Sequence, residues 1–395
     1  MITRITLVLG LLLAAAPTMP AGWSTFHGNP QRTGLTPALG PTAPVAQWTL
    51  DLRGPILTSP VLGSDGTIYL GSTLVEGLRP QYCIVAVAND GTIKWRFPVG
   101  FLDHDMPTQS SIAVGPNGMI YGGGIRGFFA VHPSGTLSWS FPSATMVIQS
   151  PVIAPNGTVL VGIDGNLMAF TADGAVLWQH RIMESQLSGG PSLSNDGSTV
   201  YAISAFFGGT SELHAYDVAT GTLLWTYAID QYFWPLAPPT VGPDGTIYTA
   251  STGIDAVRPD GSLKWYSEPS FGINSLGSIA VDAQSNLYYT AYVYIWKLDA
   301  NGNTVWQKTI TEDGFRLGSS YNSILVDGRG NLFLGFGTGK RWALDFEKKL
   351  WVLANNGTIM KKVPLDEASY TSSPALADDG TLYVGTLGGT LRALR

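Results

Sequence analysis

The chain has 395 residues, of which 45% are hydrophobic and 13% are charged, and its formal net charge is −6 at pH 7. This apolar content excludes a disordered polymer, whereas the 48 glycines and the low charge favour many short strands joined by tight turns. We expect no nucleic-acid partner, because an acidic chain without a basic run lacks the clustered Lys and Arg that a polyanion requires.

Residues 1–21 have the pattern of a secretory signal peptide. Arg4 precedes an apolar run from about Ile5 to Ala16, and small residues follow up to Ala21. The run is too short to span a bilayer and no later stretch approaches its length, so we expect no membrane span. The one cysteine, Cys83, predicts neither a disulfide nor a thiolate zinc site. We therefore expect an exported monomer, periplasmic or secreted, without a lipid anchor on an N-terminal cysteine.

Two segments follow the leader before the repeats begin. Residues 22–44 form a lead-in, whose role the sequence leaves open. The segment VAQWTLDL (45–52) reads as a single isolated strand that contains Trp48.

One phrase recurs eight times, from SPVLGSDGTIYLGS (59–72) to SPALADDGTLYVGT (373–386). Each copy has two short apolar runs around Asp-Gly, Asn-Gly or a substitute, which predicts a hairpin with a two-residue turn at positive φ. A second hairpin follows in most copies, as in AYDVATGTLLW (215–225). Each copy is therefore expected to supply four strands, A to D in chain order.

Four strands per copy, repeated about every 40–50 residues, predict an all-β, eight-bladed β-propeller of four-stranded antiparallel blades. A solenoid would need polar capping repeats, which neither end provides. The last copy stops after strand C, and residues 45–52 supply the missing strand D. We therefore expect residues 45–395 to form one propeller, closed by a hybrid blade from both termini that leaves no open sheet edge.

Seven of the 12 tryptophans fall at one position of the repeat. Six of them lie four residues after a turn glycine, and Trp48 has the same position in the isolated strand at 45–52. Each is interpreted as a wedge between adjacent blades. They are Trp48, Trp95, Trp139, Trp178, Trp225, Trp265 and Trp306. The seventh copy departs from the rule, because Lys361 follows Gly357 where a tryptophan is expected.

The run Ala215–Trp225 resembles the tryptophan-docking motif of quinoprotein (pyrroloquinoline quinone-type) propellers. The segment WSTFHGNPQRTGLTP (23–37) is similar to the W-x-x-F-x-G-x-P-x-R-T-G lead-in that is common before such propellers. The resemblance extends over residues 23–395 and implies the propeller fold, but this repeat serves many functions.

Two groups within the resembled superfamily imply different functions. Its quinone-dependent dehydrogenases carry a vicinal disulfide and a Glu/Asn/Asp calcium site beside a catalytic Asp. Cys83 alone cannot form that disulfide, and the carboxylate set has no match in this sequence. The propeller lipoprotein of the outer-membrane barrel-assembly machinery binds another protein and has no catalytic activity. It is tethered by an N-terminal lipidated Cys, which is not found in this sequence.

In a propeller the D–A and B–C loops share one face, and function usually lies on such loops. The candidate binding face consists of Asp103, His104, Asp105, Glu184, Tyr232, Phe233, Trp234, Glu312, Asp313 and Arg316. Three consecutive aromatic residues at 232–234 cannot all enter one blade interface, so they either meet a partner or close the channel mouth. The acidic and His cluster at 103–105 is a solvated loop, a metal site, or an acid–base group acting with Glu184 or Glu312.

The basic insertion at 335–349 is either a docking loop or a solvated hairpin extension.

We predict an exported, non-catalytic scaffold that binds a protein or another macromolecule through this loop face, with no cofactor, no metal and no catalytic residue. One alternative is a quinone-dependent oxidoreductase with pyrroloquinoline quinone and calcium, and another is a glycan-binding or glycan-cleaving propeller. Deletion of residues 45–52 is expected to be more damaging than deletion of 23–40.

Overall fold

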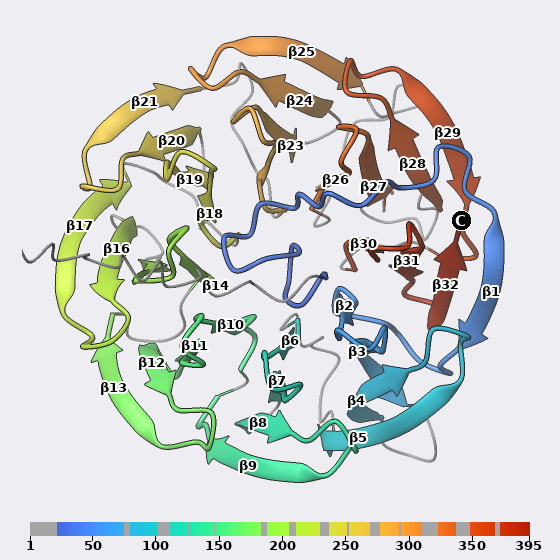
Figure 1. The fold of residues 1–395 in the computed structure, drawn as a ribbon, viewed down its shortest axis with the longest axis horizontal. Helices are drawn as coiled ribbons and strands as arrows, with labels where there is room; N and C mark the ends of the chain where they lie inside the picture. The colour runs from blue at the N-terminus through green and yellow to red at the C-terminus, as the bar shows by residue number, and fades with distance from the viewer. Residues whose placement is uncertain are drawn as a thin grey trace, which may run out of the picture.

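The computed structural model describes residues 22–74, 80–101, 111–124, 126–145, 147–182, 188–204, 211–229, 237–250, 253–268, 277–291, 294–309, 323–336, 348–367 and 372–395. These residues form eight four-stranded antiparallel sheets, arranged as blades around a central axis (Figure 1). The predicted all-β, eight-bladed propeller is confirmed. No helix among the described residues is long and apolar enough to cross a membrane.

The first four blades are numbered I to IV, and each is given from its innermost to its outermost strand. Blade I contains β2 (Val61–Leu62), β3 (Ile68–Leu74), β4 (Gln81–Val87) and β5 (Ile93–Phe101). Blade II contains β6 (Ala113–Val114), β7 (Ile120–Gly124), β8 (Gly127–Val131) and β9 (Leu137–Pro142). Blade III contains β10 (Val152–Ile153), β11 (Val159–Ile163), β12 (Asn166–Phe170) and β13 (Val176–Arg181). Blade IV contains β14 (Ser188–Leu193), β15 (Thr199–Ser204), β16 (Ser211–Asp217) and β17 (Leu223–Ile229).

The remaining blades follow the same order. Blade V contains β18 (Thr240–Val241), β19 (Ile247–Ala250), β20 (Ile254–Val257) and β21 (Leu263–Ser267). Blade VI contains β22 (Ala280–Val281), β23 (Leu287–Ala291), β24 (Tyr294–Leu298) and β25 (Thr304–Thr309). Blade VII contains β26 (Leu325–Val326), β27 (Leu332–Phe336), β28 (Lys349–Leu353) and β29 (Ile359–Pro364). Blade VIII contains β30 (Ala375–Leu376), β31 (Leu382–Gly385), β32 (Thr390–Leu394) and β1 (Ala46–Asp51).

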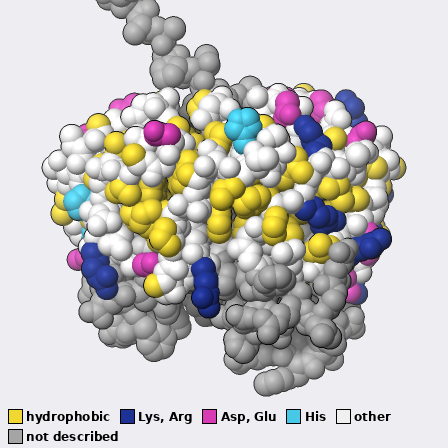
Figure 2. All heavy atoms as spheres, turned by 90° about the horizontal axis from the view of Figure 1, so that it is seen from below, with side chains coloured by type: hydrophobic (Ala, Val, Ile, Leu, Met, Phe, Trp, Pro, Cys, Tyr) yellow, Lys and Arg dark blue, Asp and Glu magenta, His cyan; other side chains and the backbone are white. Residues whose placement is uncertain are grey.

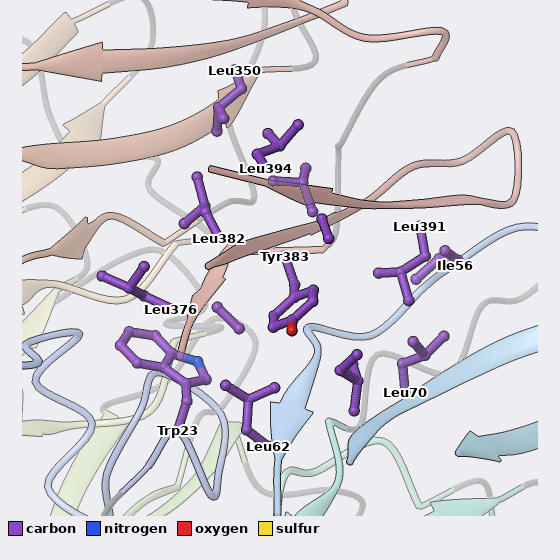
Figure 3. Close-up of a cluster of buried hydrophobic side chains, with 14 of the residues drawn as sticks. Trp23, Ile56, Leu62, Leu70, Leu350, Leu376, Leu382, Tyr383, Leu391 and Leu394 are labelled. Atoms are coloured by element: carbon purple, nitrogen blue, oxygen red, sulfur yellow. The ribbon is translucent and has the colours of Figure 1, made fainter. Parts of the chain in front are cut away.

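Blade VIII is the predicted hybrid blade, which is confirmed, because its strand order is β1-β32-β31-β30. The two segments are joined at their ends by a pair of backbone hydrogen bonds, from Val45 N to Arg395 O at 2.8 Å and from Arg395 N to Val45 O at 2.9 Å. Buried side chains such as Leu382, Leu391 and Leu394 form the core of this blade (Figure 3). The N-terminal outer strand therefore completes a sheet whose other strands come from the last repeat.

The repeated Asp-Gly turns differ from the two-residue turns predicted from the sequence. In blade I, Ala88 N donates to Thr92 O at 2.8 Å, so three residues lie between the paired ends, and only Gly91 has a positive φ, of 88°. The Asp90 side chain accepts a hydrogen bond from Thr92 N at 2.9 Å, which holds the turn without a positive φ at Asp90. A two-residue turn does occur between β11 and β12, where Asp164 and Gly165 have φ values of 50° and 78°.

The recurring tryptophans lie at the seams between blades. Each of the seven indole Nε1 atoms donates to a backbone carbonyl in the C–D turn of the next blade, at 2.8 to 3.0 Å. The ring also covers the turn glycine: a Cβ added to Gly174 would lie 2.6 Å from Cδ2 of Trp139. The turn glycine therefore provides both the left-handed conformation and the space for the neighbouring indole.

The position of Lys361 in blade VII is explained by the closure of the ring. Lys361 pairs with Val352 at the register position that a tryptophan occupies in the other blades, and it is exposed. Blade VIII has no C–D turn, since its strands β32 and β1 are the two ends of the propeller. A tryptophan at 361 would have neither a turn glycine to cover nor a turn carbonyl to bind.

The outer strands leave apolar side chains exposed around the rim, just before the recurring tryptophan (Figure 2). These include Leu137, Val176, Leu177, Leu223, Leu224, Leu263 and Val305. Their regular position shows that they belong to the repeat pattern of the outer strands.

We predict that Trp178→Ala lowers the free energy of unfolding by about 2 kcal/mol, because it removes a large, partly buried side chain packed between blades III and IV and a hydrogen bond to Val218 O. Lys361→Ala is the matched control and is expected to change stability by less than about 0.5 kcal/mol. Urea unfolding followed by circular dichroism measures both. Equal losses would show that the tryptophan position does not depend on the neighbouring turn.

Candidate functional site

The residues of the candidate binding face lie outside the described residues, so that face stays a prediction. They are Asp103, His104, Asp105, Glu184, Tyr232, Phe233, Trp234, Glu312, Asp313 and Arg316. Of the basic insertion at 335–349, the structure describes residues 335, 336, 348 and 349, and Lys348 Nζ lies 2.8 Å from Glu367 Oε1.

The axis of the ring is occupied by part of the lead-in, residues 22–38, which we call the axial segment. It loops across the centre of the propeller, in blue in Figure 1. Most of its side chains are buried; Trp23 is 2% exposed, His27 1% and Arg32 0%. The lead-in is therefore an internal part of the ring, and the expectation that its deletion is the milder one stays a prediction.

The axial segment contacts the blades in their order round the ring. In six blades the last residue of the innermost strand donates its N–H to a carbonyl of the axial segment. These bonds run from Leu62 to Trp23, Val114 to Ser24, Leu193 to Pro30, Val241 to Gln31, Val281 to Thr33 and Val326 to Gly34, at 2.7 to 2.9 Å. Each bond satisfies a backbone donor that would otherwise face the axis unpaired.

Blades III and VIII contact the axial segment by other means. Thr25 Oγ1 donates to Pro151 O in blade III at 3.2 Å. Trp23 packs in one apolar cluster with Leu376 of blade VIII and Leu62 of blade I (Figure 3). The segment thus links all eight blades.

Arg32 anchors the segment between blades III and IV. Its guanidinium donates to Ser150 O at 2.8 Å and Pro151 O at 3.0 Å, and to Pro191 O at 3.1 and 3.3 Å. It also donates to Thr25 Oγ1 and Phe26 O, both at 3.0 Å, within the segment itself. Every nitrogen of the side chain is used, and burial lowers the pKa of Arg32 to about 9, which leaves it protonated at neutral pH.

His27 connects the segment to blade VII. Nδ1 lies 2.6 Å from Arg32 O and Nε2 lies 2.8 Å from Ile324 O. An imidazolium would donate to both carbonyls, but it would place a second buried cation beside Arg32. Burial is the largest effect and lowers the pKa of His27 to about 4, so the ring is neutral at pH 7 and donates at one nitrogen.

The backbone of the axial segment is held in the left-handed region at both anchors. His27 has φ 60° and Arg32 has φ 61°, and neither is a glycine. Gly34 has φ 65°, and a Cβ added to it would lie 2.3 Å from His27 Nε2. Such strain persists only where surrounding contacts fix the conformation, here the buried bonds of the two anchors.

A series of hydrogen bonds between serines connects the inner ends of neighbouring blades. The N–H of one serine donates to the Oγ of the equivalent serine in the next blade, at 2.9 to 3.2 Å, in the order 278, 323, 373, 59, 111 and 150. Gly190 in blade IV has no hydroxyl and Pro238 in blade V has no N–H. The chain of bonds is therefore interrupted there, and Ser278 Oγ is buried without a partner.

A Ser–His–Glu group in blade IV does not have the geometry of a hydrolase triad. Ser204 Oγ lies 2.9 Å from His214 Nε2, and Glu212 Oε2 lies 3.7 Å from the same nitrogen. In a triad the carboxylate orients the opposite nitrogen of the imidazole. Ser204 is also fully buried, so no substrate can reach its hydroxyl.

The described residues do not fit a quinone and calcium site of the kind carried by the quinone-dependent dehydrogenases. Cys83 is the sole cysteine, and it is buried within blade I, opposite Ser72. Within the described ranges no group of three or more His, Cys, Asp or Glu side chains could hold a metal ion. The expectation that the protein has no cofactor stays a prediction, because the loops between these ranges lie outside the description.

The axial segment was not predicted as a site from the sequence. The signal was the unusual density of Trp, His, Gly, Pro and Arg in WSTFHGNPQRTGLTP (23–37). A segment without strand periodicity has no reason to carry so many residues with special geometry unless its backbone is fixed by buried contacts.

Solved structures with the same propeller fold include two dehydrogenases and a BamB protein. A europium-containing methanol dehydrogenase superposes with a TM-score of 0.74 at 11% identity, covering 96% of this chain and 99% of that one. BamB from Moraxella catarrhalis gives a TM-score of 0.64 at 15% identity, over 89% and 98% of the two chains. The quinohemoprotein alcohol dehydrogenase ADHIIG from Pseudomonas putida HK5 gives 0.70 at 11% identity, over 98% and 82%. At these identities the likeness shows the fold alone.

The chain belongs to the family described as outer membrane protein assembly factor BamB (PQQ_2), whose model matches residues 82–233 and 209–354. No curated protein matches the chain.

We predict that the stability of the protein depends on pH through His27. Above pH 6.5 the ring is neutral in both states; between 6.5 and about 4 the unfolded chain binds a proton that the folded chain does not. Stability therefore falls as the pH falls through this window, by about 3 kcal/mol in total, and this contribution levels off below pH 4.

His27→Gln should remove this part of the pH dependence, measured as the unfolding free energy at pH 7.5 and 4.5. Burial also lowers the pKa of His214, which titrates in both proteins, so the difference between them isolates His27. His132→Gln, on an exposed turn, is the control for the substitution itself. Parallel curves for the wild type and His27→Gln would contradict the assignment.

Proposed function

We propose that this protein is an exported propeller scaffold that binds another protein and performs no catalysis itself. The observation that carries the proposal is its membership of a family described as outer membrane protein assembly factor BamB, over residues 82–354. Export is supported by the leader pattern of residues 1–21 and by the same family description.

The physical basis of such binding is a surface formed before the partner arrives. Eight sheets are joined round the ring, at seven of the eight seams by a tryptophan, and across the axis by residues 22–38. A rigid frame of this kind loses little conformational freedom on association, so more of the contact energy appears as affinity. We assign the partner to the predicted loop face, because the sequence at 232–234, Tyr-Phe-Trp, contains the aromatic residues that interfaces favour.

We predict that a photo-crosslinking amino acid at position 232 forms protein adducts in the exported fraction of the source cells. The same group at Asp260, on the exposed C–D turn of blade V, is the matched control and should form none. Adducts are separated by mass and their sizes compared. Adducts from position 260 alone would contradict the assigned face, and the lack of adducts from both positions would contradict a protein partner.

A quinone-dependent oxidoreductase is the second candidate, favoured by the superposition on two dehydrogenases with TM-scores of 0.74 and 0.70. Among the described residues no group of His, Cys, Asp or Glu side chains could hold the metal ion, so no reaction step is assigned to them.

We predict that pyrroloquinoline quinone, added with calcium or a lanthanide ion, is removed completely by desalting. Quinone absorbance that stays with the protein at one equivalent would overturn the non-catalytic proposal. The apo protein incubated with the metal ion alone is the control.

A further inference from the structure

We propose that the axis of the propeller is a peptide-binding site. Its resident ligand is the axial segment, residues 22–38, and the site accepts the same segment as a separate peptide. The site is distinct from the predicted loop face, and the inference does not depend on the proposed function.

The axial segment is bound by its main chain, as a peptide ligand can be, although its backbone turns at His27 and Arg32. Its carbonyls receive N–H groups from six separate strands, one after another, and none of these strands belongs to the segment itself. Main-chain bonds of this kind give affinity, while side chains in defined places give specificity. A covalent link to the ring is not needed for any of them.

Arg32 is the residue that determines specificity. Three carbonyls from two neighbouring blades, those of Ser150, Pro151 and Pro191, converge on its guanidinium at 2.8 to 3.3 Å. The planar fork of arginine can meet all three, whereas the point charge of a lysine cannot. Without the guanidinium these carbonyls lose their donor in a site closed to water.

The site is complete only after the ring has closed. The segment bonds to blade I through Trp23 and to blade VII through Gly34, and Trp23 packs against blade VIII. These blades become neighbours when β1 pairs with β32. The segment therefore binds the closed ring and holds the first and last blades together.

The connection to the rest of the chain can be cut without removing these contacts. Thr42 and Ala43 are exposed, and they lie between Gly40, whose N–H binds the Asp327 carboxylate, and Val45, which begins the pairing with the C-terminus. A protease site inserted between 42 and 43 in the full chain allows cleavage after folding.

The experiment cleaves the folded protein and adds a fluorescent synthetic peptide of residues 22–42 in excess. We expect the cleaved segment to stay bound through size-exclusion chromatography and then to exchange with the labelled peptide. Arg32→Ala in the peptide should weaken its binding by at least about 100-fold, because several charged hydrogen bonds are lost. Arg32→Lys should recover only part of the loss. Leu39→Ala, at a side chain that is 47% exposed, is the matched control and should bind like the wild type.

Three results would overturn the proposal. In the first, cleavage releases the segment and the ring melts at an unchanged temperature. In the second, the bound segment never exchanges with the labelled peptide. In the third, the Arg32→Ala peptide binds as tightly as the wild-type peptide. Because cleavage follows folding, none of these results depends on whether a truncated chain can fold.

Discussion

The structure depends on how the inner edges of the blades are satisfied. In seven of the eight blades the innermost strand is only two residues long, and it pairs on one side alone. The other side faces the axis, where an unpaired N–H in a closed space costs about 1–3 kcal/mol. Residues 22–38 remove that cost in six blades with carbonyls of their own. In this propeller a segment that does not belong to the repeat therefore satisfies the inner edges of six blades.

The closure of the ring also changes the blades beside it. Blade VIII is made from both ends of the propeller, so it lacks the turn on which the tryptophan of the preceding blade would dock. Lys361 occupies that place, and Trp48 of blade VIII still reaches the next turn at Asn89 O. The exception in the seventh copy is thus a consequence of having both ends of the propeller in blade VIII. It needs no separate function.

The repeat could be predicted from the sequence because every copy carries the same turn glycine and the same tryptophan spacing. The hybrid blade followed from the missing strand at the C-terminus and the isolated strand at 45–52. The type of turn could not be predicted, since Asp-Gly suits both a two-residue turn and the observed three-residue turn, in which the Asp90 carboxylate caps Thr92 N. The axial segment was missed because its contacts are with residues up to 297 positions away in the chain, as between His27 and Ile324. Such contacts leave no periodic pattern in the sequence.

Departures from the repeat define where the axial segment sits. Eight similar blades offer eight similar sets of inner N–H groups, so hydrogen bonds from the repeat alone would allow several rotations of the segment round the axis. The series of serine-to-serine hydrogen bonds between neighbouring blades is interrupted at Gly190 and Pro238. There, Ser192 of blade IV and Thr240 of blade V bind the next blade instead. Arg32 binds at the edge of this interruption, at Pro191 O. The irregular blades thus mark one position round the ring, and the buried guanidinium of Arg32 binds beside it.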